Sequence, residues 1–310
     1  MPSESVYLGI DVSKQELHLN GLGLALRKVP NTRPALQRLA LRLKQRPNAV
    51  VCCEATGGYE SLLVQILSDS GIPVALVNPK RVRDFAKSKG ILAKTDQLDA
   101  AVLRSFAEQN QPRPLQALPK DLAELRSLLL RREQLVEALK CEKQRLDPKP
   151  PQIVLQSLRA HIAVLQRHLD KLEKAIKQLV ADHDPLAQKV AGYTRVNSIG
   201  LQSALYLTAF VPELGRITDQ QAAALVGLAP FNVDSGQFRG RRCIRGGRPR
   251  VRRILYMAAV CGKTTNPILR DFYNRLIARG KPPKLALTAV MRKIVLLANR
   301  IAGDPAFVPA

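Results

Sequence analysis

The sequence contains no tryptophan, and aromatic residues make up only 4% of its 310 positions. Proteins that bind single strands by base stacking need exposed aromatic rings, so stacking is not expected to be a main mode of binding here. Acidic residues are also scarce, with 25 Asp and Glu against 49 Lys and Arg and a formal net charge of +24. The usual partner of so basic a protein is a polyanion.

Residues that bind soft metals are few and scattered. The five cysteines form no Cys-x-x-Cys pair and there are only four histidines, so a zinc site is not expected. An odd, scattered set of cysteines is typical of reduced thiols in a cytoplasm. No secretory signal is visible, and no apolar run approaches the roughly 18 residues that span a membrane. We therefore expect a cytoplasmic, nucleoid-associated protein with no membrane partner.

The positive charge is concentrated near the C-terminus. Residues 239–300 hold 17 basic residues and a single acidic one, Asp271. So large a local excess repels itself unless an anion meets it, and contact with phosphate backbones is the usual reason for it. A solvated basic surface is the simpler alternative. A membrane surface fits less well, because the segment has no tryptophan and no long amphipathic stripe.

Residues 1–115 predict an α/β domain. Apolar runs at 6–12, 49–53 and 72–77 predict buried strands, and the alternating pattern over 16–29 predicts a hairpin. Apolar residues at helical spacing follow Thr32, recur between the later strands and return over 96–109. Strands that alternate with helices are typical of an α/β fold.

Residues 116–186 predict two long helices, at 120–146 and 152–182, separated by a proline-rich break. In the second helix all eight positions of a coiled-coil seam are apolar. In the first helix Val136 belongs to the predicted seam and Arg132 interrupts it. A narrow seam is satisfied by a hairpin within one chain or by pairing between two chains, and both interpretations stay open.

Residues 187–310 predict a mostly α-helical domain with one irregular segment. Helices are expected at 249–262, 266–279 and 283–301, and residues 230–248 read as a loop rich in Gly and Arg.

Four carboxylates stand at strand ends or on one helix face. Asp11 and Glu54 each end an apolar strand, and Asp96 and Asp99 lie three residues apart on a predicted helix. If the strands are neighbours, the four side chains converge, and a cluster of acidic oxygens is what a hard divalent cation requires. Two such ions can clamp the attacking and leaving oxygens of phosphoryl transfer. Taken singly, each acid is also explained as a helix cap or a charge at the rim of the fold.

The residues around these acids resemble a known family. The stretches Val-Tyr-Leu-Gly-Ile-Asp-Val-Ser-Lys (6–14), Cys-Glu-Ala-Thr-Gly-Gly-Tyr (53–59) and Lys-Thr-Asp-Gln-Leu-Asp-Ala (94–100) resemble the DEDD transposases of bacterial insertion sequences, the IS one-ten family. Downstream, Ala-Ala-Leu-Val-Gly-Leu-Ala-Pro (223–230) and Asp-Ser-Gly (234–236) are similar to the same family. The resemblance implies an α/β RNase H-like (RuvC-like) N-terminal catalytic domain at 1–115. A helical coiled-coil middle at 116–186 and a mostly α-helical C-terminal transposase domain at 187–310 would follow.

The resemblance also implies roles for single residues. Asp11, Glu54, Asp96 and Asp99 would form a tetrad that binds Mg²⁺, and Ser235 would be a nucleophile that joins the protein to DNA. Eight arginines near this serine are natural contacts for phosphate or RNA: Arg239, Arg241, Arg242, Arg245, Arg248, Arg250, Arg252 and Arg253. The implied partners are DNA at the element ends and target, a bridge RNA that supplies sequence information, and further copies of the chain in a dimer or tetramer.

One stretch departs from the family pattern. Val-Asn-Ser-Ile-Gly at 196–200 stands where the family has a Pro-Gly-Ile-Gly-like turn that binds the DNA backbone. Two alternative functions remain beside the recombinase. One is a RuvC-like, magnesium-dependent junction nuclease that uses water. The other is a nucleic-acid-binding protein without catalysis.

Overall fold

The computed structural model describes residues 5–23, 27–55, 57–93, 95–115, 118–147, 150–231, 234–235, 238–239, 242–304 and 306–308, with the backbone alone at 234–235 and 238–239. The chain divides into two compact units, Met1–Ala117 and Leu118–Ala310. Each unit has its own hydrophobic core.

The first unit is built on a mixed five-stranded sheet with the order β3-β2-β1-β4-β5 in the described residues. Its strands are β1 (Val6–Val12), β2 (Glu16–Asn20), β3 (Lys28–Pro30), β4 (Ala49–Glu54) and β5 (Val74–Val77). β1, β2 and β3 form an antiparallel meander, whereas β4 runs parallel to both β1 and β5. The prediction of an α/β domain in this part of the chain is confirmed.

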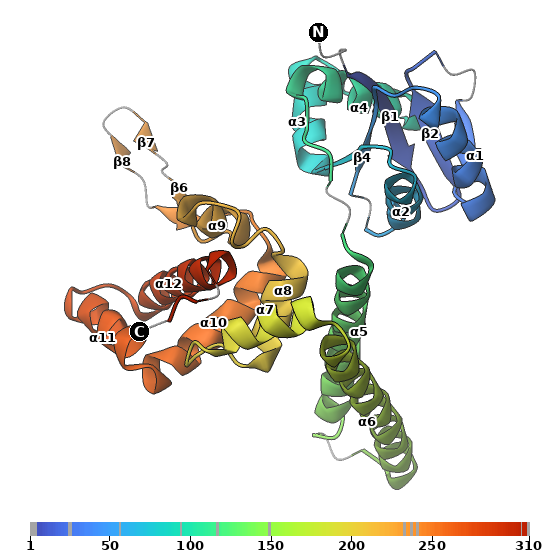
Figure 1. Cartoon of the computed structure of the whole chain (residues 1–310). Coiled ribbons are helices and arrows are strands. Elements are labelled where there is room, and N and C mark those ends of the chain that lie inside the picture. The colour runs from blue at the N-terminus through green and yellow to red at the C-terminus, as the bar shows by residue number, and fades with distance from the viewer. Residues whose placement is uncertain are drawn as a thin grey trace. The chain divides into compact units, whose positions relative to one another are not determined.

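Helices cover both faces of the sheet (Figure 1). α1 (Arg33–Lys44) and α2 (Ser61–Asp69) pack on the face of Leu8 and Ile10. α3 (Pro79–Ser88) and α4 (Asp96–Asn110) pack on the opposite face, with Tyr7 and Cys52. The core divides into two clusters, one on each face of the sheet, because successive side chains of a strand point to opposite faces.

α4 lies directly against β1. A Cβ atom placed on Gly9 would overlap the carbonyl oxygen of Ala100 and the amide nitrogen of Arg104. Only glycine permits this approach of helix backbone to strand backbone.

α3 is absent from the sequence prediction, which has only the strand at 72–77 before the helical pattern over 96–109. The signal for it is local: the side chain of Asn78 accepts a hydrogen bond from the Lys80 amide at 2.8 Å, and Pro79 occupies the first turn. This is the usual start of a helix. The run of basic residues that follows hides its apolar side, which is reduced to Val82 and Ala86 at buried positions.

The second unit is helical apart from short strand pairs. Its helices in the described residues are α5 (Lys120–Gln144), α6 (Gln152–Ala181), α7 (Asp184–Thr194), α8 (Leu201–Phe210), α9 (Asp219–Val226), α10 (Pro249–Thr265), α11 (Pro267–Ala278) and α12 (Pro283–Gly303). α8 lies at the centre of this core, since all its residues from Ala204 to Phe210 are buried. None of the helices in the described part of the chain has the length and apolar character needed to cross a bilayer.

α5 and α6 pack against each other within the chain (Figure 1). Leu135 and Leu139 of α5 meet Leu165 and Leu169 of α6 in a separate apolar cluster. The predicted seam is wrong at one position: Leu135 is buried, whereas Val136 is 38% exposed. The predicted break at Arg132 is accommodated because its guanidinium pairs with Glu173 across the two helices at 2.8 Å.

The predicted loop at 230–248 contains two short strand pairs. β6 (Pro230–Phe231) pairs antiparallel with β9 (Cys243–Ile244), and β7 (Asp234–Ser235) pairs antiparallel with β8 (Phe238–Arg239). Strands of two residues are too short to show the alternation of apolar and polar residues from which a strand is predicted.

Candidate active site and nucleic-acid surface

The face of the sheet that α4 covers also carries Asp11. Gly9 faces α4, and Asp11 lies two residues further along β1, hence on the same face. His18 of β2 stands directly opposite Asp11 in the antiparallel register. Residues opposite each other in such a pair share a face, so Asp11 and His18 belong together.

Glu54 reaches the same face from β4. Cys52 stands opposite Gly9 in the parallel pair and packs in the core on the α4 side. Glu54 lies two residues beyond Cys52 and ends its strand. Ile10 and Cys53 are paired across the two strands. Asp11 is the residue after Ile10, and Glu54 is the residue after Cys53. The prediction that these two acids lie at or near the ends of neighbouring strands is therefore confirmed: Glu54 is the last residue of β4 and Asp11 the last but one of β1.

The start of α4 supplies the other two predicted acids. Asp96 and Asp99 lie in its first turn, after Thr95, whose side chain accepts a hydrogen bond from the Leu98 amide at 3.3 Å. Asp96 is exposed and Asp99 is half-buried. Carboxylates are favoured at a helix N-terminus, where unpaired amides concentrate positive charge. All four acids thus lie where the α4 face of the sheet meets the start of α4.

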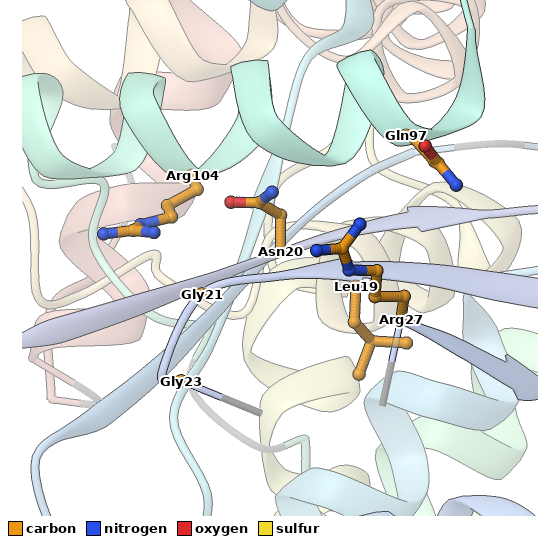
Figure 2. Close-up of a pocket in the computed structure, with 7 residues that line it drawn as sticks. All are labelled: Leu19, Asn20, Gly21, Gly23, Arg27, Gln97 and Arg104. Carbon is orange, nitrogen blue, oxygen red and sulfur yellow. The ribbon is translucent and has the colours of Figure 1, made fainter. Parts of the chain in front are cut away.

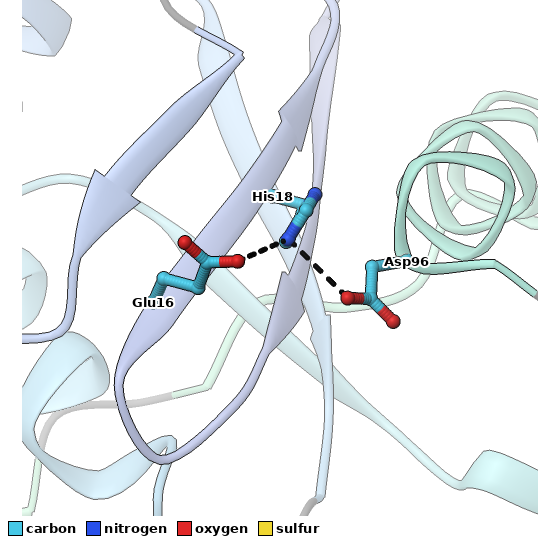
Figure 3. Close-up of side chains that lie close together, drawn as sticks. All are labelled: Glu16, His18 and Asp96. Carbon is cyan, nitrogen blue, oxygen red and sulfur yellow. Dashed lines mark hydrogen bonds and ion pairs between the residues drawn. The ribbon is translucent and has the colours of Figure 1, made fainter.

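A cluster that sequence reasoning missed lies at this place (Figure 3). The Nε2 atom of His18 lies 3.0 Å from Oε1 of Glu16 and 3.4 Å from Oδ2 of Asp96. His18 is only 4% exposed, although a histidine at a half-polar strand position gives no such signal in the sequence. The hydrogen bond from Lys28 and then that from His18 lower the pKa of Glu16, so its carboxylate is ionised.

Within the described ranges, Glu16, His18 and Asp96 are the residues whose potential metal-binding atoms all lie within 4.8 Å of one another. Asp11, Glu54 and Asp99 are not part of that group. The chemistry of the whole donor set nevertheless fits a hard divalent cation, because it is rich in carboxylate oxygens on one face. Burial and then the charge of Glu54 raise the pKa of the nearby Cys52 thiol to about 12, and hard divalent cations prefer oxygen ligands to sulfur.

The side chains of Ser235 and Arg239 lie outside the described residues, as does all of Arg241. For Ser235 the structure gives the backbone pairing with Phe238.

Three of the predicted nucleic-acid-binding arginines are held by the protein itself. Arg248 donates to both carboxylate oxygens of Glu213, at 2.5 and 2.7 Å. Arg250 donates to Glu133 at 2.7 Å and lies 5.2 Å from the centroid of the Phe210 ring. Arg252 donates to the carbonyl oxygen of Gly246 at 2.7 Å. These contacts fix the start of α10.

The other three described arginines face solvent. Arg242, Arg245 and Arg253 are exposed, and none forms a hydrogen bond or ion pair with the described part of the chain. They are available to an external anion in a way that Arg248 and Arg250 are not.

Two family models match the chain. The first, a DEDD transposase model of the IS110 family, matches residues 8–149 and so spans all four acids. The second, described as transposase of the IS116/IS110/IS902 family, matches residues 194–274, which include Ser235 and the arginines.

The chain belongs to the IS110 family of transposases.

Similar proteins cover most of this IS110-family transposase. A pilin gene-inverting protein of Moraxella lacunata is 26% identical over 253 residues, which cover 80% of this chain and 78% of the relative. An insertion element IS110 protein of 43.6 kDa from Streptomyces coelicolor is 24% identical over 388 residues, 97% of this chain and 95% of the relative. Family membership makes the chain a DNA-processing enzyme of the transposase and recombinase type.

Solved structures of Thermus thermophilus RuvC also match. One, in complex with a Holliday junction substrate, covers 36% of this chain and 100% of the RuvC chain, with 16% identity and a TM-score of 0.28. A second covers 36% of this chain and 99% of the RuvC chain, with 18% identity and a TM-score of 0.25.

Proposed function

We propose that this transposase cuts and rejoins DNA at the ends of an insertion sequence and at a target, with a carboxylate tetrad in its first unit and Ser235 in its second. The observation that carries the proposal is the shared face of the sheet. Asp11 and Glu54 end neighbouring parallel strands on the face that α4 covers, and α4 begins with Asp96 and Asp99. Strand register and the start of α4 thus direct four acids from three separate elements to one face of the sheet, which supports a shared site.

The tetrad would hold Mg²⁺ through Asp11, Glu54, Asp96 and Asp99. When bound, such ions stabilise negative charge on the attacking and leaving oxygens of phosphoryl transfer. The protein contributes the placement: two ligands are fixed by strand register, and two by the capped first turn of α4.

Ser235 would supply the nucleophile. Its hydroxyl oxygen attacks a backbone phosphorus and forms a serine–phosphate ester, while the bond from phosphorus to the 3′ oxygen breaks. The serine proton is lost to a base, and the 3′ oxygen leaves as a hydroxyl after taking up a proton. In rejoining, a 3′ hydroxyl attacks the ester and releases the serine. The bond count is conserved, so no external energy source is needed.

Two relatives, from Moraxella lacunata and Moraxella bovis, favour rejoining over hydrolysis. The Moraxella proteins are described as inverting a pilin gene, and inversion requires that cut ends be joined again. A junction nuclease that uses water leaves ends that it cannot rejoin.

The exposed arginines Arg242, Arg245 and Arg253 would contact nucleic-acid phosphates, together with Arg239 and Arg241. The held arginines Arg248, Arg250 and Arg252 would shape the surface on which they stand. By family resemblance the nucleic acids are DNA and a bridge RNA, and the active form is a dimer or tetramer.

Trapping the covalent intermediate tests the proposal. The purified protein with Mg²⁺ and DNA of an element end should yield a protein–DNA adduct that survives denaturation. Ser235→Ala should lose both the adduct and strand exchange, whereas Ser203→Ala, a serine of α8 in the same unit, should keep both. Cleavage by Ser235→Ala at the wild-type rate would establish the water-using nuclease instead. Binding without magnesium-dependent cleavage would establish a non-catalytic protein.

A further inference from the structure

We propose that a pocket in the first unit, between β2 and α4, binds a backbone phosphate of the reacting DNA strand. This phosphate lies one or two nucleotides from the phosphate that reacts. The identity of the strand rests on the proposed function. The pocket itself is defined by the structure alone, and nothing in the family resemblance assigns a role to it.

The pocket has a volume of about 310 Å³. Its lining residues are Leu19, Asn20, Gly21, Gly23, Arg27, Gln97 and Arg104 (Figure 2). A water molecule takes up about 30 Å³ in the liquid, so the space admits a phosphate group with part of its sugar. The pocket is accessible to solvent, since of the two arginines that line it Arg27 is exposed and Arg104 is half-exposed.

The lining is suited to an anion. None of the seven residues that line the pocket is acidic, and four of them carry N–H donors on their side chains. The guanidinium of Arg27 is exposed and forms no side-chain hydrogen bond or ion pair within the described residues. Arg104 uses its Nε atom to hold Glu108 at 2.7 Å, which leaves its two terminal nitrogens for a ligand. A guanidinium presents paired donors that match phosphate oxygens.

The turn after β2 leaves room for this ligand. Gly21 and Gly23 have positive φ angles of 128° and 60°. A Cβ placed on Gly21 would overlap the carbonyl oxygen of Tyr7, whereas a Cβ placed on Gly23 would meet no atom of the described residues within 4 Å. The absence of a side chain at Gly23 therefore allows a phosphate to approach the backbone there.

The pocket adjoins the candidate active site along two elements. Gln97 directly follows Asp96 on α4, and Asn20 lies two residues beyond His18 on β2. Two strand residues span about 7 Å, and each nucleotide of a duplex strand rises about 3.4 Å. A strand whose reacting phosphate lies at the acids therefore brings a phosphate one or two nucleotides away to this pocket.

Salt dependence of binding tests the proposal without requiring cleavage. We would use the full-length protein in an Asp11→Asn background and a single-stranded DNA of the element end. Arg27→Gln should reduce the slope of log K against log salt by about 0.7, the contribution of one phosphate on a single strand, and Arg27→Lys should restore it. The control is Arg38→Gln, which removes the same charge from α1 on the opposite face of the sheet and should leave the slope unchanged.

Equal slopes for Arg27→Gln and its parent would overturn the proposal, and so would a reduction seen only with RNA of the same sequence. A second measurement locates the contact. Single neutral methylphosphonates placed along the DNA should weaken binding at a position one or two nucleotides from the reacting phosphate, and that weakening should disappear in Arg27→Gln. Interference that persists in the variant would place the contact elsewhere. Because uncut DNA is measured, these outcomes are independent of whether Ser235 forms an adduct.

Discussion

The Nε2 atom of His18 lies 3.4 Å from Oδ2 of Asp96, so a buried imidazole of β2 contacts the first carboxylate of α4. The same nitrogen lies 3.0 Å from Glu16, and the other ring nitrogen, Nδ1, is buried without a hydrogen-bond partner among the described residues. His18 also stands opposite Asp11 in the sheet. One side chain therefore links the strand that faces Asp11 to the helix that carries Asp96.

Replacing His18 by Leu should lower the free energy of unfolding by about 1–3 kcal/mol, because the change removes the hydrogen bond between the buried imidazole and the Glu16 carboxylate and the contact with Asp96. Urea denaturation in the absence of divalent ions measures this. Lys28→Gln removes the exposed partner of Glu16 and should lower the free energy of unfolding by less than His18→Leu does, because solvent screens exposed ion pairs. Equal effects of the two substitutions would show that the buried contact contributes nothing special.

Asp11→Asn should abolish magnesium-dependent strand cleavage while leaving nucleic-acid binding nearly intact, because it removes a hard ligand and no basic residue. Cleavage assays and titration with Mg²⁺ by calorimetry measure the two effects. Glu60→Gln is the matched control: its carboxylate accepts a hydrogen bond from the Gly58 amide at 2.9 Å, and only Glu54 holds the family position. Unchanged cleavage by Asp11→Asn would remove this residue from the tetrad.

The double substitution Arg242→Gln and Arg245→Gln should weaken the salt dependence of duplex binding. The slope of log K against log salt should become less steep by about 0.9 for each phosphate that the pair no longer neutralises. The melting temperature should stay the same, since both side chains are exposed. Arg248→Gln should instead lower the melting temperature, because it breaks the double hydrogen bond to Glu213. A melting temperature that falls more for the exposed pair than for Arg248 would contradict this division of the arginines.

The Arg248–Glu213 pair should make the second unit sensitive to acid. Burial raises the pKa of Glu213, but the hydrogen bonds and charge of Arg248 outweigh it and hold the pKa below its ordinary 4.5. A depressed carboxyl pKa adds stability above the unfolded-state value, and that stability is lost as the pH falls through the folded-state value. Urea midpoints measured from pH 7 downward should therefore drop below about pH 4.5. Glu213→Gln should be less stable at pH 7 and should show a smaller drop.

Mixing Asp11→Asn protein with Ser235→Ala protein should recover activity, because family resemblance favours sites assembled from different subunits. Strand exchange by the mixture is compared with that of each protein alone. Absence of recovery, with mixed oligomers demonstrated by differently tagged chains, would mean that the tetrad and the serine act within one chain.

Much of the fold could be predicted because strong local patterns control it. The apolar runs of β1 and β4 and the long helices α5 and α6 all lie within a few residues of their expected bounds. α3 was missed because it is short and basic, and its start depends on Asn78 and Pro79 rather than on periodicity. The helix pair buries Leu135 in place of the expected Val136. Which of the two is buried depends on how α6 packs against α5, and the sequence of α5 alone does not determine that packing.

The candidate site was predictable only in part. Asp11 and Glu54 are marked by their places at strand ends, and strand pairing brings them together. His18 gave no signal, because its contact with Asp96 joins residues 78 positions apart through the packing of α4 on β2. The arginines look alike in the sequence, yet Glu133 and Glu213, supplied by distant segments, engage two of them.

The packing at Gly9 lets the main chain set the distance between the acids of the strands, Asp11 and Glu54, and the acids of α4, Asp96 and Asp99. At Gly9 no side chain separates β1 from α4, so the backbone of the helix contacts the backbone of the strand there, and two backbones in contact cannot move closer. Substitutions in the surrounding core can then change stability without altering how far Asp96 and Asp99 stand from Asp11. Position 9 is the exception, since even one methyl group there would push α4, with Asp96 and Asp99 at its start, away from β1.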